Sequence, residues 1–136
     1  MGATSFLTAR LMEAWAHGTD IADVVGVLRV PTNRLRHIAQ LGYITRGWSY
    51  SVRGQKAPDV DVRLALSSPS GEIWTWGPDD ATQCVTGSAE EFCLVVTQRR
   101  HVEDTSLAAT PIALDWLVRA QAFAGGPSVP PAPRAR

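Results

Sequence analysis

The hydrophobic period of the chain changes from helical to alternating near residue 60, and this change constrains the fold more than any other feature. Before it, apolar residues recur every three or four positions, as in amphipathic helices. Over residues 60–66, apolar side chains alternate with more polar ones, which predicts a strand with one buried face. Residues 67–71 read Ser-Ser-Pro-Ser-Gly, a turn composition, and residues 72–76 predict the returning strand of a hairpin.

Helix signals divide the first part of the chain into three predicted helices. The first covers residues 3–17 and is expected to stop at Gly18, because glycine has a low helix propensity. Thr19 is then the expected N-cap of a short helix over residues 20–27, and a third helix is expected to begin near residue 33.

The part after the hairpin predicts one more strand and two helices. Residues 83–86 favour a short strand, and Ser88 with Glu91 forms a capping box that opens a helix over residues 89–99. A final helix is expected over residues 111–124, with proline at its first position. The element order predicts an α+β fold: N-terminal helices, then an antiparallel sheet covered by the two C-terminal helices.

Composition narrows the classes of function. The 13 basic and 13 acidic residues balance, so the charge pattern of a nucleic-acid or membrane-surface binder is missing, and neither partner is expected. Two cysteines, Cys84 and Cys93, are too few for a disulfide framework, and no apolar run is long enough for a membrane span. A soluble cytoplasmic protein is the expectation. Residues 126–136 carry four prolines and are expected to be disordered.

One polar stripe on the first predicted helix has the spacing of a candidate metal site. Arg10, Glu13, His17 and Asp20 follow one another at intervals of three, four and three residues, which places them on one side of a helix. Glu13 and His17 lie one turn apart, so both could reach a single divalent ion. The alternative is an ordinary carboxylate and imidazole interaction on the helix surface.

Several segments also resemble a known family, the mycothiol-dependent maleylpyruvate isomerase-like, DinB-related metal-binding proteins. Residues 5–23 are similar to the last helix of that family's metal-binding bundle, where arginine, glutamate, histidine and aspartate recur at the same spacing. Residues 75–78, 85–87, 92–101 and 120–125 are similar to its C-terminal domain.

The resemblance implies a metal site and a division into domains. Glu13 and His17 would be two of the three protein ligands to zinc, and mycothiol would be the thiol cofactor. The implied activity is either that of an isomerase or that of a transferase. The implied domains are a bundle remnant over residues 1–30, a sterol-carrier-like α+β domain over 31–125, and the tail over 126–136. The third ligand, a histidine of an earlier helix in the family, has no counterpart here.

A missing ligand and missing neighbours both predict a partner. A homodimer or a complementary bundle chain would supply the missing zinc ligand. The other source would be this chain itself, whose remaining histidines are His37 and His101. Self-association is also expected because the first helix would expose an apolar face. That face consists of Phe6, Leu7, Leu11, Met12 and Trp15.

The second hypothesis is a stand-alone binding or accessory domain with an apolar small-molecule pocket. Trp74 and Trp76 alternate to the same side of the returning strand, so they could line such a pocket and bind a ligand or cofactor. Burial of both rings against the helices is the competing interpretation.

Overall fold

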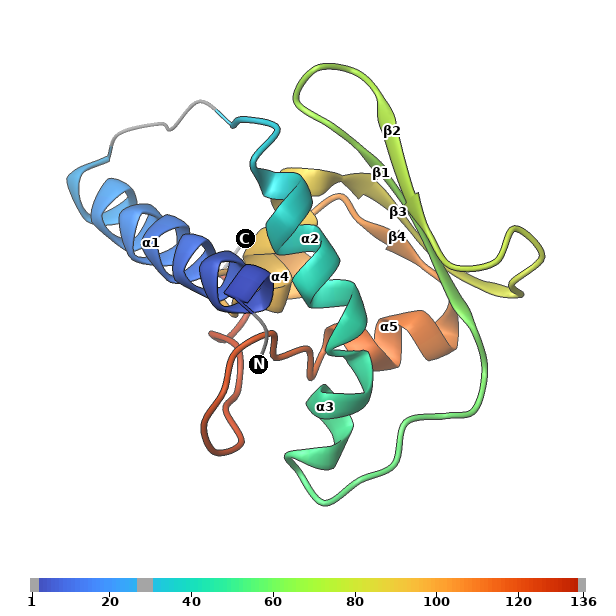
Figure 1. Ribbon diagram of the computed structural model, residues 1–136. Coiled ribbons are helices and arrows are strands. Elements are labelled where there is room, and N and C mark those ends of the chain that lie inside the picture. The colour runs from blue at the N-terminus through green and yellow to red at the C-terminus, as the bar shows by residue number, and fades with distance from the viewer. Residues whose placement is uncertain (1–2, 27–30, 135–136) are drawn as a thin grey trace.

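The computed structural model describes residues 3–26 and 31–134, without the side chains of residues 3–6. As predicted, helices come first, a hairpin and a third strand follow, and two helices come last, but a two-residue strand that was not predicted precedes the final helix (Figure 1). The helices are α1 (Ala3–Val25), α2 (Leu35–Ile44), α3 (Arg46–Ser51), α4 (Ala89–Val96) and α5 (Pro111–Leu117), with a short 3₁₀ helix η1 (Val102–Asp104). The strands are β1 (Val62–Ser67), β2 (Ile73–Trp76), β3 (Gln83–Ser88) and β4 (Ala108–Ala109).

The four strands form one sheet in the order β2-β1-β3-β4, which confirms the α+β fold class. The β1–β2 and β3–β4 pairs are antiparallel, but the central β1–β3 pair is parallel. The sheet is therefore mixed, and the prediction of a purely antiparallel sheet was wrong. The cause lies in residues 77–82. Strand β2 ends beside the start of β1, and the loop crosses this end of the sheet to the opposite edge of β1. Strand β3 begins there, next to the start of β1, and runs in the same direction as β1.

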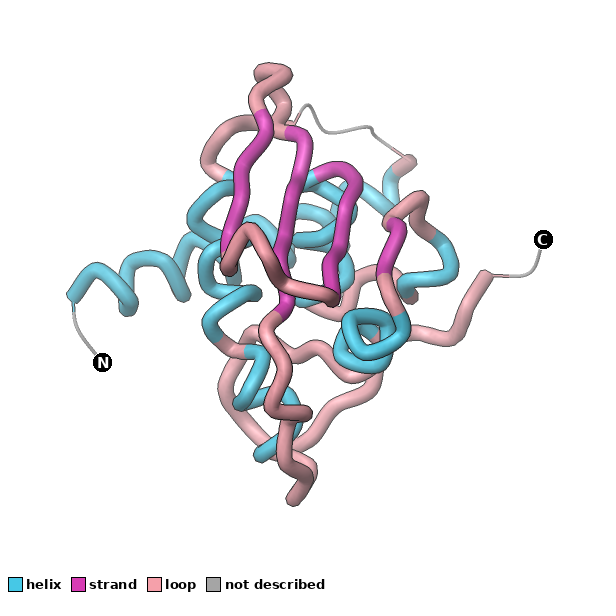
Figure 2. Tube along the Cα trace, turned by 90° about the vertical axis from the view of Figure 1, so that its right-hand side faces the viewer, coloured by secondary structure: helices cyan, strands magenta, loops and turns pink. Residues whose placement is uncertain are grey.

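The helices lie on one face of the sheet, as Figure 2 shows with the strands in front. Val62, Leu64 and Leu66 point into this layer and are at most 2% exposed, as the alternation predicted. They share a core with Ile38 of α2 and Phe92 of α4. The hydrophobic core therefore lies between the sheet and the α2–α4 pair.

Helix α1 runs through Gly18 without a break, so the predicted stop at residue 17 and the second helix over 20–27 are wrong in their boundaries. Residue 27, the last of that second helix, lies outside the described residues. Thr19 is not an N-cap. Its hydroxyl donates a 3.0 Å hydrogen bond to the carbonyl of Trp15 within the helix. Burial of Met12, Ala16 and Thr19 on one side of α1 explains why packing overcomes the low propensity of one glycine.

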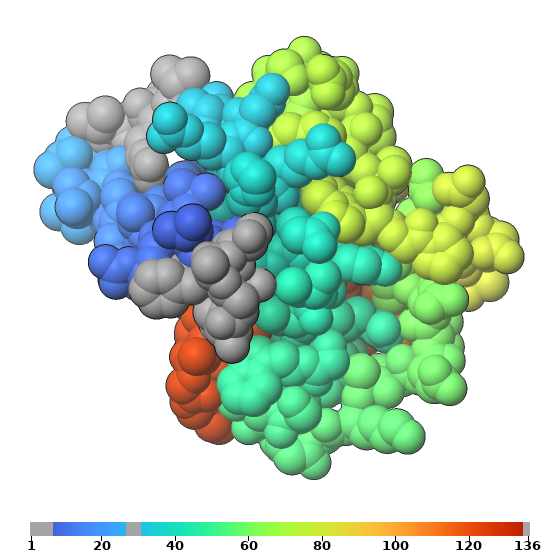
Figure 3. All heavy atoms as spheres, in the orientation of Figure 1, coloured from blue at the N-terminus to red at the C-terminus, as the bar shows by residue number. Residues whose placement is uncertain are grey.

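The predicted apolar face of α1 is largely covered. Met12 is 4% exposed, Leu11 and Trp15 are partly buried, and Leu7 is exposed, whereas the side chain of Phe6 lies outside the described residues. In the space-filling view, α1 lies at the margin of the molecule, on the side away from the β1–β2 hairpin (Figure 3).

The last two helices are shorter than predicted. Helix α4 begins after the predicted N-cap Ser88, whose Oγ accepts a 3.0 Å hydrogen bond from the Glu91 amide, but it ends at Val96. The Glu91 carboxylate accepts from the Ser106 amide, so the second half of the predicted capping box is replaced by a contact with that loop. Gln98, with φ of 59°, turns the backbone out of the helix there. Helix α5 ends at Leu117.

The backbone after α5 is held by a buried amide. The Gln121 side chain donates to the carbonyls of Phe123 and Gly126 and accepts from the Ser128 amide. Residues 126–134 form no helix or strand. None of the helices in the described part of the chain is long and apolar enough to cross a membrane.

Candidate functional site

Glu13 and His17 lie on the exposed side of α1, with side chains 55% and 73% exposed. Glu13 faces Arg10 at 3.8 Å, and His17 Nδ1 lies 4.0 Å from a carboxylate oxygen of Asp20. The stripe is therefore a row of solvated side-chain pairs at helical spacing.

A zinc site does not fit these residues. Among the described residues, no three His, Cys, Asp or Glu side chains come together in a way that could hold a metal ion. Zinc sites use three or more protein ligands, so the predicted classification as a zinc-binding protein is wrong. His37 is exposed on α2, and His101 Nδ1 accepts a hydrogen bond from the Glu103 amide. Among the described residues, neither histidine forms a metal-binding group with the pair on α1.

Trp74 and Trp76 point to the helical face of the sheet and pack against α2. Trp74 is 5% exposed, and the Arg36 guanidinium lies 5.9 Å from the centre of its ring. The indole of Trp76 donates a hydrogen bond to the side-chain oxygen of Gln40. The two rings cover α2 from the hairpin side, and they are not among the residues that line either of the two cavities described below.

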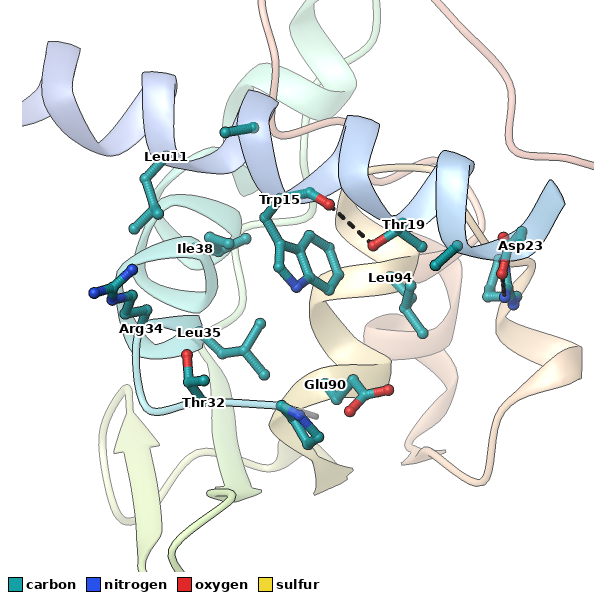
Figure 4. A pocket seen from close by; sticks show the side chains of 14 residues that line it. Leu11, Trp15, Thr19, Asp23, Thr32, Arg34, Leu35, Ile38, Glu90 and Leu94 are labelled. Carbon is teal, nitrogen blue, oxygen red and sulfur yellow. Dashed lines mark hydrogen bonds and ion pairs between the residues drawn. The ribbon is translucent and has the colours of Figure 1, made fainter. Parts of the chain in front are cut away.

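A concave site lies where α1 crosses α2 and α4, and it is the larger of two cavities among the described residues. It is a cavity of about 380 Å³, within the range of small-molecule sites. Its apolar lining comes from all three helices and comprises mainly Leu11, Trp15, Leu35, Ile38 and Leu94. The indole of Trp15 projects from α1 into the space between α2 and α4 (Figure 4). Leu35 and Ile38 are at most 2% exposed, so the cavity has a rigid floor.

Polar side chains surround this apolar floor. Thr32 and Arg34 precede α2, and Glu90 lies in the first turn of α4. Among the described residues, no ion pair or side-chain hydrogen bond is found for the Arg34 guanidinium, which is exposed at the rim. The cavity is therefore bordered by an aromatic ring at Trp15 and a carboxylate at Glu90, with the Arg34 guanidinium at its outer edge beside α2 (Figure 4).

Two bidentate ion pairs fix α1 over the cavity. Arg99 donates to both carboxylate oxygens of Asp20 at 3.0 and 3.1 Å, and Arg100 donates to both oxygens of Asp23 at 2.8 Å. The hydrogen bond from Arg100 lowers the pKa of Asp23, and the same bond raises the pKa of Arg100. Asp23 and Arg100 also line the cavity, so this pair closes one of its ends.

Sequence reasoning missed this site because its walls are distant along the chain. Trp15 and Leu11 were identified only as apolar positions of a helix. Thr32, Arg34 and Glu90 carry no local signal that would connect them with Trp15. The available signal was indirect: a tryptophan beside small residues on a helix whose outer side is polar.

Comparison with known proteins places a family model on part of this chain. A model described as Wyosine base formation matches residues 68–110. This segment includes β2, β3, α4 and β4, and it supplies Glu90 and Leu94 of the α4 wall of the cavity, with Arg100 from the loop after α4.

Two mycobacterial proteins are similar over nearly the whole chain. They are uncharacterized protein MT0041 of Mycobacterium tuberculosis strain CDC 1551 / Oshkosh and uncharacterized protein Rv0036c of strain ATCC 25618 / H37Rv. Each is 52% identical over 128 residues, which is 93% of this chain and 50% of the relative. The chain thus spans about half the length of these curated relatives. No solved structure is significantly similar to it.

These findings correct the predicted family. The matching model concerns wyosine base formation, and neither it nor the relatives support a maleylpyruvate isomerase-like or DinB-related protein. The predicted mycothiol-linked function, and its sterol-carrier-like alternative, lose their basis with that family. The helical spacing behind the resemblance is accounted for by surface pairs such as Arg10 with Glu13.

Proposed function

We propose that the protein is a binding module for a planar nitrogen heterocycle of the purine kind, held in the cavity between α1, α2 and α4. The observation that carries the proposal is the position of Trp15, whose indole lies in a 380 Å³ cavity with an apolar floor and a polar rim. Stacking of a base on an aromatic side chain contributes about 1–3 kcal/mol, and the two-ring face of indole suits a two-ring base.

The rim supplies the hydrogen-bonding groups that a heterocycle needs. The Glu90 carboxylate accepts from ring N–H or exocyclic amino groups, and the Arg34 guanidinium donates to ring nitrogens or carbonyl oxygens. The description of the matching family model, Wyosine base formation, supports a ligand that contains a base, and the α4 wall belongs to the matched segment. The balanced charge of the chain favours a small ligand over a polynucleotide.

Calorimetric titration with adenine and with hypoxanthine tests the proposal. We expect saturable binding with one site per chain and a dissociation constant below about 1 mM. Trp15→Leu keeps an apolar side chain but removes the stacking face, so it should weaken binding by about 5- to 100-fold. Circular dichroism of this variant must match the wild type for the loss to count.

Trp76→Leu is the matched control, because Trp76 packs against α2 outside the cavity. It should leave the affinity unchanged. A loss of binding in Trp76→Leu together with normal binding in Trp15→Leu would place the ligand at the hairpin and overturn the proposal. Absence of binding to both purines would overturn it as well.

A further inference from the structure

Three arginines surround Tyr50 where α3 packs against α5. Arg46, Tyr50 and Arg53 follow one another at intervals of four and three residues along α3 and the turn that ends it, which places them on one side of the helix. Arg119 follows α5, and its guanidinium lies 5.0 Å from the centre of the Tyr50 ring. We refer to Arg46, Arg53 and Arg119 as the arginine corner.

Within the described part of the chain, one carboxylate contacts the arginine corner. Asp115 Oδ2 accepts from Arg119 at 3.1 Å and from the Tyr50 hydroxyl at 2.7 Å. Neither Arg46 nor Arg53 forms an ion pair with a described residue. Two of the three positive charges therefore have no negative partner there.

Carbonyl groups fix these two arginines without neutralising them. Arg53 donates to the carbonyl of Ser49 at 2.6 Å and also to that of Ser128, and Arg46 donates to the carbonyl of Pro58 at 3.2 Å. A guanidinium has five N–H donors, so each of the two keeps donors for a further acceptor. One of them, Nε of Arg46, is buried and has no hydrogen-bond partner among the described residues.

The arginine corner is electrostatically unfavourable as it stands. Burial lowers the pKa of Arg53, and the charge of Arg119 lowers it further. Both effects oppose the charged form of Arg53. An oxyanion would relieve them, because guanidinium groups bind phosphate oxygens through paired, charge-assisted hydrogen bonds. The side chain of Arg119 is 27% exposed and Arg53 is partly exposed, so an anion can approach from solvent.

We propose that the arginine corner is a second binding site, which takes the phosphate group of a soluble phosphate monoester. Arg53 and Arg119 bind the phosphate oxygens, and Arg46 contributes its charge. The two charges of the phosphate match the two unpaired arginines. None of these residues lines the helical cavity, so the inference is independent of the proposed function. The balanced charge of the whole chain favours a small anion over a polynucleotide or a membrane surface.

Calorimetric titration with glycerol 3-phosphate tests the inference. The experiment is run near pH 8, where a phosphate monoester with a second pKa of about 6 is doubly charged. We expect saturable binding at one site per chain, with a dissociation constant of about 0.1–1 mM. Arg53→Gln should weaken binding by about 10-fold or more, because a hydrogen bond between charged groups is lost. Circular dichroism of this variant must match the wild type.

Two further variants assign the effect to the charges of the arginine corner. Asp115→Asn removes its carboxylate but keeps an oxygen acceptor, so it should tighten binding by several fold. This gain keeps the test decisive if Arg53→Gln does not fold. Arg36→Gln is the matched control, because Arg36 lies at the far end of α2, over the ring of Trp74, and it should leave the affinity unchanged.

Several results would overturn the inference. They are the absence of saturable binding to the wild type, unchanged binding in folded Arg53→Gln, weaker binding in Asp115→Asn, or an equal loss in Arg36→Gln. Binding to vesicles that contain phosphatidic acid, without binding to glycerol 3-phosphate, would assign the arginine corner to a membrane and overturn the soluble ligand.

Discussion

At the scale of single residues, Tyr50 shows how the fold fixes a polar group in its core. The ring is 2% exposed, and its hydroxyl donates a 2.7 Å hydrogen bond to Asp115 Oδ2 on α5. The Arg119 guanidinium donates to the same oxygen at 3.1 Å and lies 5.0 Å from the centre of the tyrosine ring. Burial and the neighbouring carboxylate raise the pKa of Tyr50 to about 12.

Replacing Tyr50 with phenylalanine should lower the free energy of unfolding by about 1.5–3 kcal/mol, because the hydrogen bond to a charged acceptor is lost. The folded pKa of Tyr50 lies above its unfolded value of 10.0, so its contribution is present below pH 10 and is lost as the pH rises toward about 12. Urea denaturation at pH 7 and near pH 11 measures both effects. The wild type and Tyr50→Phe should differ less at the higher pH, and a constant difference would contradict this account.

At the scale of elements, α1 is attached to the domain by its inner apolar side and by the two aspartate and arginine pairs. Asp23→Asn should loosen the C-terminal turns of α1 and speed amide exchange there by up to about fivefold, since an exposed pair contributes less than about 1 kcal/mol. The pKa of Asp23 is lowered, so in the wild type the same contribution is present above the unfolded pKa and is lost as the pH falls through the folded pKa.

Hydrogen exchange of α1 amides at neutral and acidic pH measures this effect. Asp79→Asn provides the control, because Asp79 pairs with Arg63 on β1, away from α1. Unchanged exchange in Asp23→Asn, or equal acceleration in both variants, would show that this ion pair does not fix the helix.

Elements with strong local patterns were predictable from the sequence, and the others were not. The alternation before Ser67 predicted β1, and the capping box of Ser88 with Glu91 predicted the start of α4. The end of α1 was not predictable, because the packing that carries the helix past Gly18 comes from distant residues. The two-residue strand β4 and the parallel β1–β3 pairing also depend on contacts that are distant in the sequence.

The candidate site also shows the difference between local patterns, which are predictable from the sequence, and contacts between distant residues, which are not. Trp15 was recognised as an apolar position, but only the crossing of α1 over α2 and α4 makes it the wall of a cavity. Glu13 and His17 had a suggestive spacing, and tertiary structure supplies no third ligand among the described residues. Spacing along one helix determines which side chains are neighbours, whereas a site requires neighbours from several elements.

At the scale of the whole molecule, α1 exposes four apolar side chains beside its polar row. Leu7, Ile21, Val24 and Val25 are between 61% and 86% exposed. Exposed patches of this kind often mark interfaces, so we predict that the chain self-associates through this surface at tens of micromolar, a concentration chosen from typical affinities.

Sedimentation equilibrium tests the self-association. Ile21→Lys should shift the wild-type dimer to monomer, because the charge would lie within the contact. Ile73→Lys, which replaces an equally exposed isoleucine on β2, should not. A wild-type monomer throughout the concentration range, with α1 folded, would contradict this use of the surface.

The location of the bound ligand tests the central claim most directly. Adenosine is titrated into ¹⁵N-labelled protein, and the shift of each backbone amide is followed by NMR. The account predicts that the largest changes fall in residues 11–23, 31–38 and 90–100, the three segments around Trp15. Changes confined to the β1–β2 hairpin, or no changes at saturating adenosine, would contradict it.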